Sequence, residues 1–145
     1  MSGLAALLVG RRDPGMYHWD SHLSAIDVEH AVAHAGWRAF VLDGRTVIDV
    51  VGLHSAIATA VGFPAGYDGT WSALTDELAD LSWAPGRGRL LLYEGWGMLA
   101  RCDPTGWESA RAILSGACAH WRDSGTPFVV LLRGPGPAEG IPELR

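Results

Sequence analysis

The sequence predicts an α/β fold in which a small parallel sheet is covered by helices. Two strand-like segments, residues 89–93 and 128–132, are almost uninterrupted apolar runs, as expected of strands buried on both faces. Helical patterns lie between the strand-like segments, and this alternation is typical of a parallel sheet with helical cover. The chain has 145 residues, of which 48% are apolar and 19% charged, so one folded domain is expected.

Residues 1–36 are expected to form a strand–helix addition packed on the domain. Residues 4–9 are a short apolar run with no basic segment before it, too short to span a bilayer, so a packed helix or strand edge is expected rather than a signal peptide. Residues 16–19 are predicted to be a short edge strand. A capping-box pattern at residues 24–27 predicts a helix over residues 27–35, which Gly36 ends.

The main domain is predicted to span residues 37–132, and residues 133–145 to form a mobile tail rich in Pro and Gly. Apolar periodicity and turn residues define the elements of the main domain. We expect strands at 37–42, 89–93 and 128–132, helices at 50–61 and about 70–81, and a long helix that begins near Pro104 and ends before Gly125.

Residues 63–81 are the most informative stretch of the chain. Pro64, Gly66 and Gly69 permit a tightly bent loop. Asp68 or Thr70 can then cap the helix that follows, by accepting a hydrogen bond from a free backbone N–H.

The helix after this loop is predicted to have two unlike faces. Trp71, Leu74, Leu78 and Leu81 recur at three- and four-residue steps and form one apolar stripe. The opposite side carries Ser72, Asp76 and Asp80, with no Lys or Arg interleaved to form pairs along the helix. Trp71 is therefore expected in the core, and the acidic side in water.

The charge balance and the cysteine content limit the classes of function. A net charge of −5 argues against nucleic-acid binding, which requires a basic surface. The same charge suits a cationic protein partner, whose approach it would accelerate. The two cysteines, Cys102 and Cys118, make no disulfide framework, so a reducing cytoplasm is the expected location.

Two patterns resemble sites for enzymes or cofactors. Residues 95–100 match the G-x-G-x-x-A dinucleotide motif, but the breaker residues 101–106 interrupt the helix that should follow, and a tight turn with a packed Trp96 explains the pattern as well. Cys118 lies on an apolar helix stripe, as a small buried hydrophobic residue does. No GxSxG or HExxH motif is present, so neither an enzyme nor a cofactor is expected.

A histidine cluster is the candidate for metal binding. Asp27, His30 and His34 share one side of a predicted helix, and His18 and His22 precede it. A zinc site needs three or four convergent ligands, and nothing in the sequence fixes the third and fourth. A solvated polar face explains the set, so no metal is expected.

The stretch at 63–81, with its Pro turn, Tyr, Gly and Trp-x-Ala-Leu-x-Asp-x-Leu helix, resembles the barstar family of ribonuclease inhibitors. The order of strands and helices extends the resemblance over residues 37–132. It implies a barstar-like fold and an intracellular inhibitor whose loop and helix, residues 65–80, plug the active site of a ribonuclease, with carboxylates in place of substrate phosphate. The partner would be a cationic ribonuclease or related toxin, with no nucleic acid or membrane involved.

The resemblance also assigns binding residues. The family's central helix aspartate falls on Asp76, and a second helix acid falls on Ser72. The family's loop tyrosine aligns with Gly66, next to Tyr67, and a glutamate of the following long helix aligns near His120. The implied partner-binding residues are Gly66, Tyr67, Asp68, Gly69, Ser72, Asp76, Asp80 and His120.

Two other functions stand beside inhibition. One is a small-molecule-binding or enzymatic α/β domain that uses the histidines of the N-terminal addition. The other is a protein-interaction module without an inhibitory role.

Overall fold

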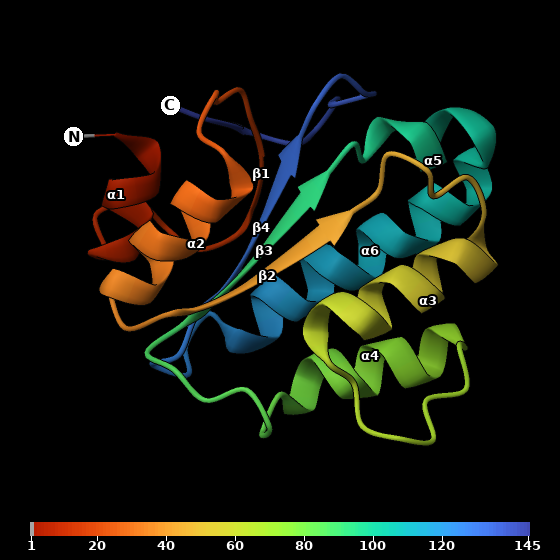
Figure 1. Cartoon of the computed structure of the whole chain (residues 1–145), viewed down its shortest axis with the longest axis horizontal. Helices are drawn as coiled ribbons and strands as arrows, with labels where there is room; N and C mark the ends of the chain where they lie inside the picture. The colour runs from red at the N-terminus through yellow and green to blue at the C-terminus, as the bar shows by residue number, and fades with distance from the viewer. Residues whose placement is uncertain (1) are drawn as a thin grey trace.

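The computed structural model describes residues 2–145, which form a five-stranded parallel sheet with helices on both faces (Figure 1). The strand order is β2-β3-β4-β1-β5, and every pair of neighbouring strands is parallel. The strands are β1 Met16–Trp19, β2 Arg38–Asp43, β3 Arg89–Glu94, β4 Phe128–Arg133 and β5 Glu143–Leu144. The helices are α1 Gly3–Leu8, α2 Ala25–His34, α3 Val50–Val61, α4 Trp71–Asp80, α5 Gly97–Cys102 and α6 Pro104–Trp121.

The sheet separates two hydrophobic cores. Figure 1 shows α1 and α2 on one side of the strands and α3, α4 and α6 on the other. Leu90 and Leu92 of β3 belong to the core beneath α1 and α2, whereas Leu91 and Tyr93 belong to the core beneath the other three helices. Alternate residues of the strand therefore point to opposite faces. This explains the unbroken apolar run and confirms the predicted α/β class.

The caps agree with the predicted ends of α3 but place the start of α2 earlier than predicted. The side chain of Asp49 accepts a hydrogen bond from the amide of Gly52 and begins α3, which ends at Gly62 with φ +77°. The side chain of Ser24 accepts from the amide of Asp27, but α2 begins at Ala25, two residues before the predicted start. Because a capping residue stands directly before its helix, the box places the first turn at residue 25.

Two expectations about the chain ends differ from the structure. β1 is not an edge strand, because it lies between β4 and β5. The sequence predicts a mobile tail, yet β5 pairs with β1, and Ile141 and Leu144 are buried. A two-residue strand after a Pro/Gly run has no periodicity that a sequence can reveal, so only the tertiary pairing defines it.

Candidate protein-binding site

In the segment 63–80, the side chains of Asp68 and Thr70 form consecutive hydrogen bonds that hold the start of α4. The carboxylate of Asp68 accepts hydrogen bonds from the backbone N–H of Thr70 (3.1 Å) and from its hydroxyl (2.8 Å). The hydroxyl oxygen of Thr70 in turn accepts from the amide of Ala73 (3.1 Å), so Thr70 is the capping residue of α4. The hydrogen bonds from Thr70 lower the pKa of Asp68, which therefore stays charged at the start of the helix.

The two faces of α4 are those that the sequence predicts. Leu74 and Leu78 are fully buried, and so is Leu81 at the end of the helix. The side chains of Ser72, Asp76 and Asp80 are exposed on the opposite side. Within residues 2–145, no Lys, Arg or His forms an ion pair with Asp76 or Asp80. We call Ser72, Asp76 and Asp80 the acidic face of α4.

The C-terminal end of α4 is held by two donors from neighbouring elements. The indole N–H of Trp121, on α6, donates to the carbonyl of Leu78 (2.7 Å). The guanidinium of Arg89 donates to the carbonyls of Leu81 (3.1 Å) and Ala84 (2.9 Å), just past the helix. Carbonyls at a helix end lack partners within the helix, and a positive charge there also complements the helix dipole. These contacts fix the helix that carries the acidic face.

Tyr67, in the loop, is turned toward the core. Its hydroxyl is hydrogen-bonded to Nδ1 of His54, on α3, and its ring packs against Phe63 with centroids 4.8 Å apart. Burial, together with the charges of Asp68 and Glu77, raises the pKa of Tyr67 to about 12. Gly66, which aligns with the family's tyrosine, is exposed with φ +98°, so the loop presents backbone at that point and its tyrosine faces inward.

Trp71 is only half-buried, although the sequence predicts it in the core. Its ring lies beside the imidazole of His54, with centroids 4.7 Å apart, at the border of the core. Trp71 is the first residue of α4, at the end of the element, and its indole stays partly open to water. Periodicity fixes the direction of a side chain along a helix, but not how far the neighbouring element extends over it.

His54 and Glu77 belong to this site, although no motif in the sequence points to them. His54 is 5% exposed and joins the ring of Tyr67 to that of Trp71. Glu77 is half-buried, and its Oε2 atom is buried without a hydrogen-bond partner among the described residues. In the sequence, the only signal for His54 is that a histidine occupies a position on the apolar stripe of α3.

His120, the last site residue implied by the resemblance, is exposed on the last turn of α6. Its ring packs edge-on against Trp121, with centroids 5.2 Å apart. Trp121 is the residue that bonds to the end of α4, so His120 lies on the helix that flanks the candidate site.

The dinucleotide-like pattern forms a tight turn with a packed tryptophan. Trp96 is fully buried, and its indole N–H donates to the carbonyl of Gly134 (3.0 Å). The helix that follows, α5, has six residues and ends at Cys102. Beside it, the carboxylate of Glu94 forms an ion pair with Arg133 (2.6 Å) at the carboxyl ends of β3 and β4. Side chains of the chain itself thus bridge the carboxyl ends of β3 and β4.

The side chains of the candidate metal site do not converge in the part of the chain that the structure describes. Asp27, His30 and His34 are exposed on α2. In the part of the chain that the structure describes, residues 2–145, no group of three or more His, Cys, Asp or Glu side chains is placed to hold a metal ion. Over the same residues, no helix combines the length and the apolar character that a bilayer crossing requires.

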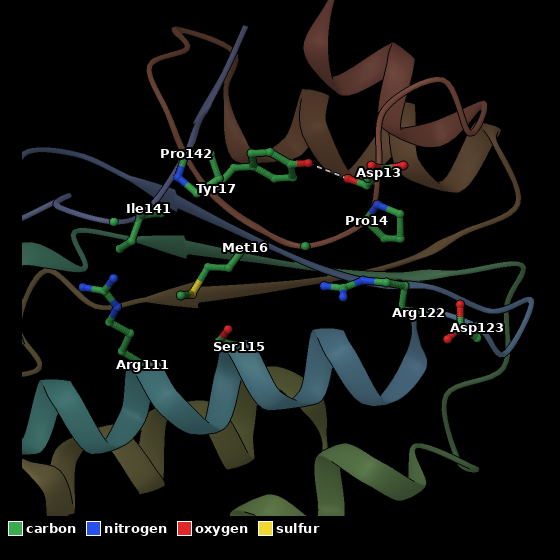
Figure 2. A pocket seen from close by; sticks show the side chains of 12 residues that line it. Asp13, Pro14, Met16, Tyr17, Arg111, Ser115, Arg122, Asp123, Ile141 and Pro142 are labelled. Atoms are coloured by element: carbon green, nitrogen blue, oxygen red, sulfur yellow. Dashed lines mark hydrogen bonds between the residues drawn. The ribbon is translucent and has the colours of Figure 1, made fainter.

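A separate hollow of about 700 Å³ lies between β1, α6 and the C-terminal tail (Figure 2). Met16 points into it from β1, Arg111 lines it from α6, and Arg122 lines it from just past the end of that helix. Asp13 and Asp123 line it as well, so it carries charges of both signs. The histidines of the N-terminal addition do not line this hollow, although the small-molecule hypothesis depends on them.

These features define a class of protein: a parallel α/β domain that exposes an acidic helix beside a glycine-containing loop. A comparison with protein-family models matches residues 37–133 to Barstar (barnase inhibitor). The match covers more than half of the chain, which therefore belongs to the Barstar family, and it confirms the resemblance found over residues 37–132. A search of curated proteins finds no match to the chain.

Proposed function

We propose that this protein is an intracellular inhibitor that binds a cationic ribonuclease, or a related toxin, made by the same cell and blocks its active site. Membership of a family described as barnase inhibitors supports a protein partner of this kind. The contact surface is the acidic face of α4 together with the loop at residues 66–69, and His120 lies at its border. Both cysteines are free thiols, in keeping with a reducing cytoplasm.

The observation that carries the proposal is the exposure of two carboxylates of one sign on the same face of α4. The carboxylates of Asp76 and Asp80 are exposed, have the same sign and form no ion pair within residues 2–145. Surface acids of a structural helix are commonly accompanied by Lys or Arg one turn away. Unpaired acids on a rigidly anchored helix can instead pair with basic groups of a partner and steer its approach.

The proposed partner-binding surface of this chain differs from the family pattern at three positions. Ser72 and Gly66 replace an acid and a tyrosine, and His120 replaces a glutamate. With Asp76 as the central carboxylate and one fewer acid on the helix, the partner is expected to present fewer basic groups than barnase does. A ribonuclease or toxin different from barnase is therefore the proposed target.

The test is a comparison of two alanine variants. Ribonuclease activity is measured in cell medium and lysate before and after passage over the immobilised protein, and the retained ribonuclease is then purified for binding measurements. Asp76→Ala should leave the stability within about 0.5 kcal/mol of the wild type, because the side chain is exposed. It should weaken binding by about 2–5 kcal/mol, because a basic group of the partner becomes buried and unpaired.

Glu29→Ala is the matched control. Glu29 is an exposed acid in the middle of α2, on the other side of the sheet from α4. Equal affinity of the two variants, or a wild-type protein that retains no ribonuclease, would rule out this function for the acidic face.

A further inference from the structure

Helix α3 has an outer face without charge. None of its twelve residues, Val50–Val61, is Asp, Glu, Lys or Arg. The side chain of Val51 is 79% exposed and that of Ile48, just before the helix, 52%. Ser55 and Thr59 continue the same line of exposed residues at four-residue steps. We call Ile48, Val51, Ser55 and Thr59 the α3 ridge.

The ridge carries no charged group, and its polar groups are the hydroxyls of Ser55 and Thr59. The hydroxyl of Thr59 donates to the carbonyl of Ser55 (3.1 Å), so its donor is used within the helix. An exposed helix face normally carries charged residues, whereas depletion of charge marks the centre of protein–protein interfaces. Two large aliphatic side chains in line with an uncharged helix face, with Asp49 as the flanking charge, therefore indicate a surface that is covered in a complex.

Hollows lie on both sides of the ridge. One, of about 560 Å³, is lined by Val51, Ser55 and Thr59 on one side and by the loop at residues 64–69 on the other. The second, of about 470 Å³, lies between the same helix and the end of β2 at Val41 and Asp43. The first hollow shares its loop wall with the proposed ribonuclease-binding surface, so the two surfaces are continuous.

The junction between the two surfaces is rigidly held. His54 lies beneath the ridge and contacts both Tyr67 of the loop and Trp71 at the start of α4. A partner that binds the acidic face would therefore meet the ridge at a fixed position. Such preorganisation reduces the entropy lost on binding.

We infer that the α3 ridge and the hollow beside it form the apolar half of the surface that binds the ribonuclease. This inference rests on the proposed function and specifies the partner further. The partner presents basic groups to the acidic face of α4 and, next to them, an uncharged apolar segment that covers Val51 and enters the hollow against Pro64 and Ala65. Continuity with the acidic face favours this occupant over a second copy of the chain.

The test replaces Val51 with an acid. Electrostatics alone would not make this change unfavourable to folding or to the approach of a cationic partner. Val51 is the second residue of α3, where a negative charge is favourable to the helix dipole, so Val51→Glu should fold normally. The added negative charge also favours the approach of a cationic partner. With the ribonuclease purified by the capture described above, the dissociation constant should nevertheless rise at least about tenfold, through faster dissociation, because a charge is buried against an apolar segment.

Ile26→Glu is the matched control. Ile26 is 63% exposed and is the second residue of α2, on the other side of the sheet. This variant should bind as the wild type does. If Val51→Glu and Ile26→Glu bind the ribonuclease with equal affinity while Asp76→Ala binds it more weakly, the ridge is not part of the binding surface. The proposed function would then remain intact. An Asp76→Ala variant that binds normally would overturn both.

Sedimentation of the protein alone tests whether a second copy of the chain, and not the ribonuclease, covers the ridge. The protein should be a monomer at the concentrations used for binding. A wild-type dimer that Val51→Glu dissociates would show that a second copy covers the ridge, and would overturn the inference.

Discussion

The imidazole of His54, on α3, is hydrogen-bonded through Nδ1 to the hydroxyl of Tyr67, in the loop before α4. The other ring nitrogen, Nε2, is buried and has no partner within residues 2–145. Burial lowers the pKa of His54, although the nearby charge of Asp68 opposes this. The neutral imidazole thus joins α3 to the loop that carries the candidate partner surface.

The stability of the protein should fall as the pH falls below about 6.5, the ordinary histidine pKa. The pKa of His54 is lower in the folded state than in the unfolded state, so its contribution is complete above the unfolded pKa and is lost as the pH falls through the folded pKa. His54→Gln should show a smaller loss of melting temperature between about pH 7 and pH 5. Parallel curves for the two proteins would contradict this.

Replacement of Tyr67 by Phe should destabilise the fold by about 1–3 kcal/mol, because the buried Nδ1 of His54 loses its partner while the ring of the side chain is kept. Urea unfolding measures the change. Tyr17→Phe is a useful comparison, since the Tyr17 hydroxyl donates to the carbonyl of Asp13 and leaves no imidazole unpaired when removed. A loss for Tyr67→Phe no larger than that for Tyr17→Phe would count against a special role of the His54 contact.

Trp71→Ala should cost about 2 kcal/mol, less than the 3–5 kcal/mol that is typical for removal of a fully buried aromatic. The reason is that the indole is half-buried and packs on His54 with one side open. Chemical denaturation, compared with Leu74→Ala at a fully buried position of the same helix, provides the measurement. A larger loss for Trp71 than for Leu74 would show that the indole is part of the central core.

Arg89→Met should destabilise the protein by about 2–4 kcal/mol, because the carbonyls of Leu81 and Ala84 lose their donors. Arg89 is 6% exposed, and no carboxylate forms an ion pair with it among the described residues. Its guanidinium also lies over the ring of Trp121 (4.7 Å to the centroid). Arg89→Lys should be only slightly better than Met, since an ammonium does not reproduce the planar fork. Full stability of the lysine variant would contradict this explanation.

The two thiols should react at very different rates. Burial raises the pKa of Cys118 to about 12, so almost no thiolate forms there near neutral pH, whereas Cys102 is exposed. A thiol reagent should modify Cys102 in the native protein and Cys118 only when the chain unfolds. Cys102→Ser should then make the native protein unreactive, and fast modification of that variant would contradict the burial of Cys118.

Local patterns in the sequence predict much of the fold. The strands at 89–93 and 128–132, the helix at 50–61 and the direction of Asp76 and Asp80 depend on periodicity within one segment, and each agrees with the structure. The exposed acids of the candidate site are predictable in the same way, since one helix carries them, whereas the contribution of His54 is not. How a partner uses those acids remains a prediction.

Other features depend on contacts between segments that are distant in the sequence. β5 exists because Glu143 and Leu144 pair with β1, about 125 residues earlier in the chain, and no local pattern marks such a pairing. Likewise, the inward turn of Tyr67 requires the imidazole of His54 from another helix.

The sequence by itself therefore determined the order of the elements from β1 to β4, without α5, and which side of α4 is acidic, because the 3.6-residue period of a helix fixes the relative directions of its side chains. Only the tertiary structure decided that Tyr67 faces inward, that Trp71 is half-buried and that the charge-free ridge of α3 borders the loop of residues 64–69. The physical reason is that a periodic pattern defines a face, whereas burial and contact depend on which other part of the chain packs against that face.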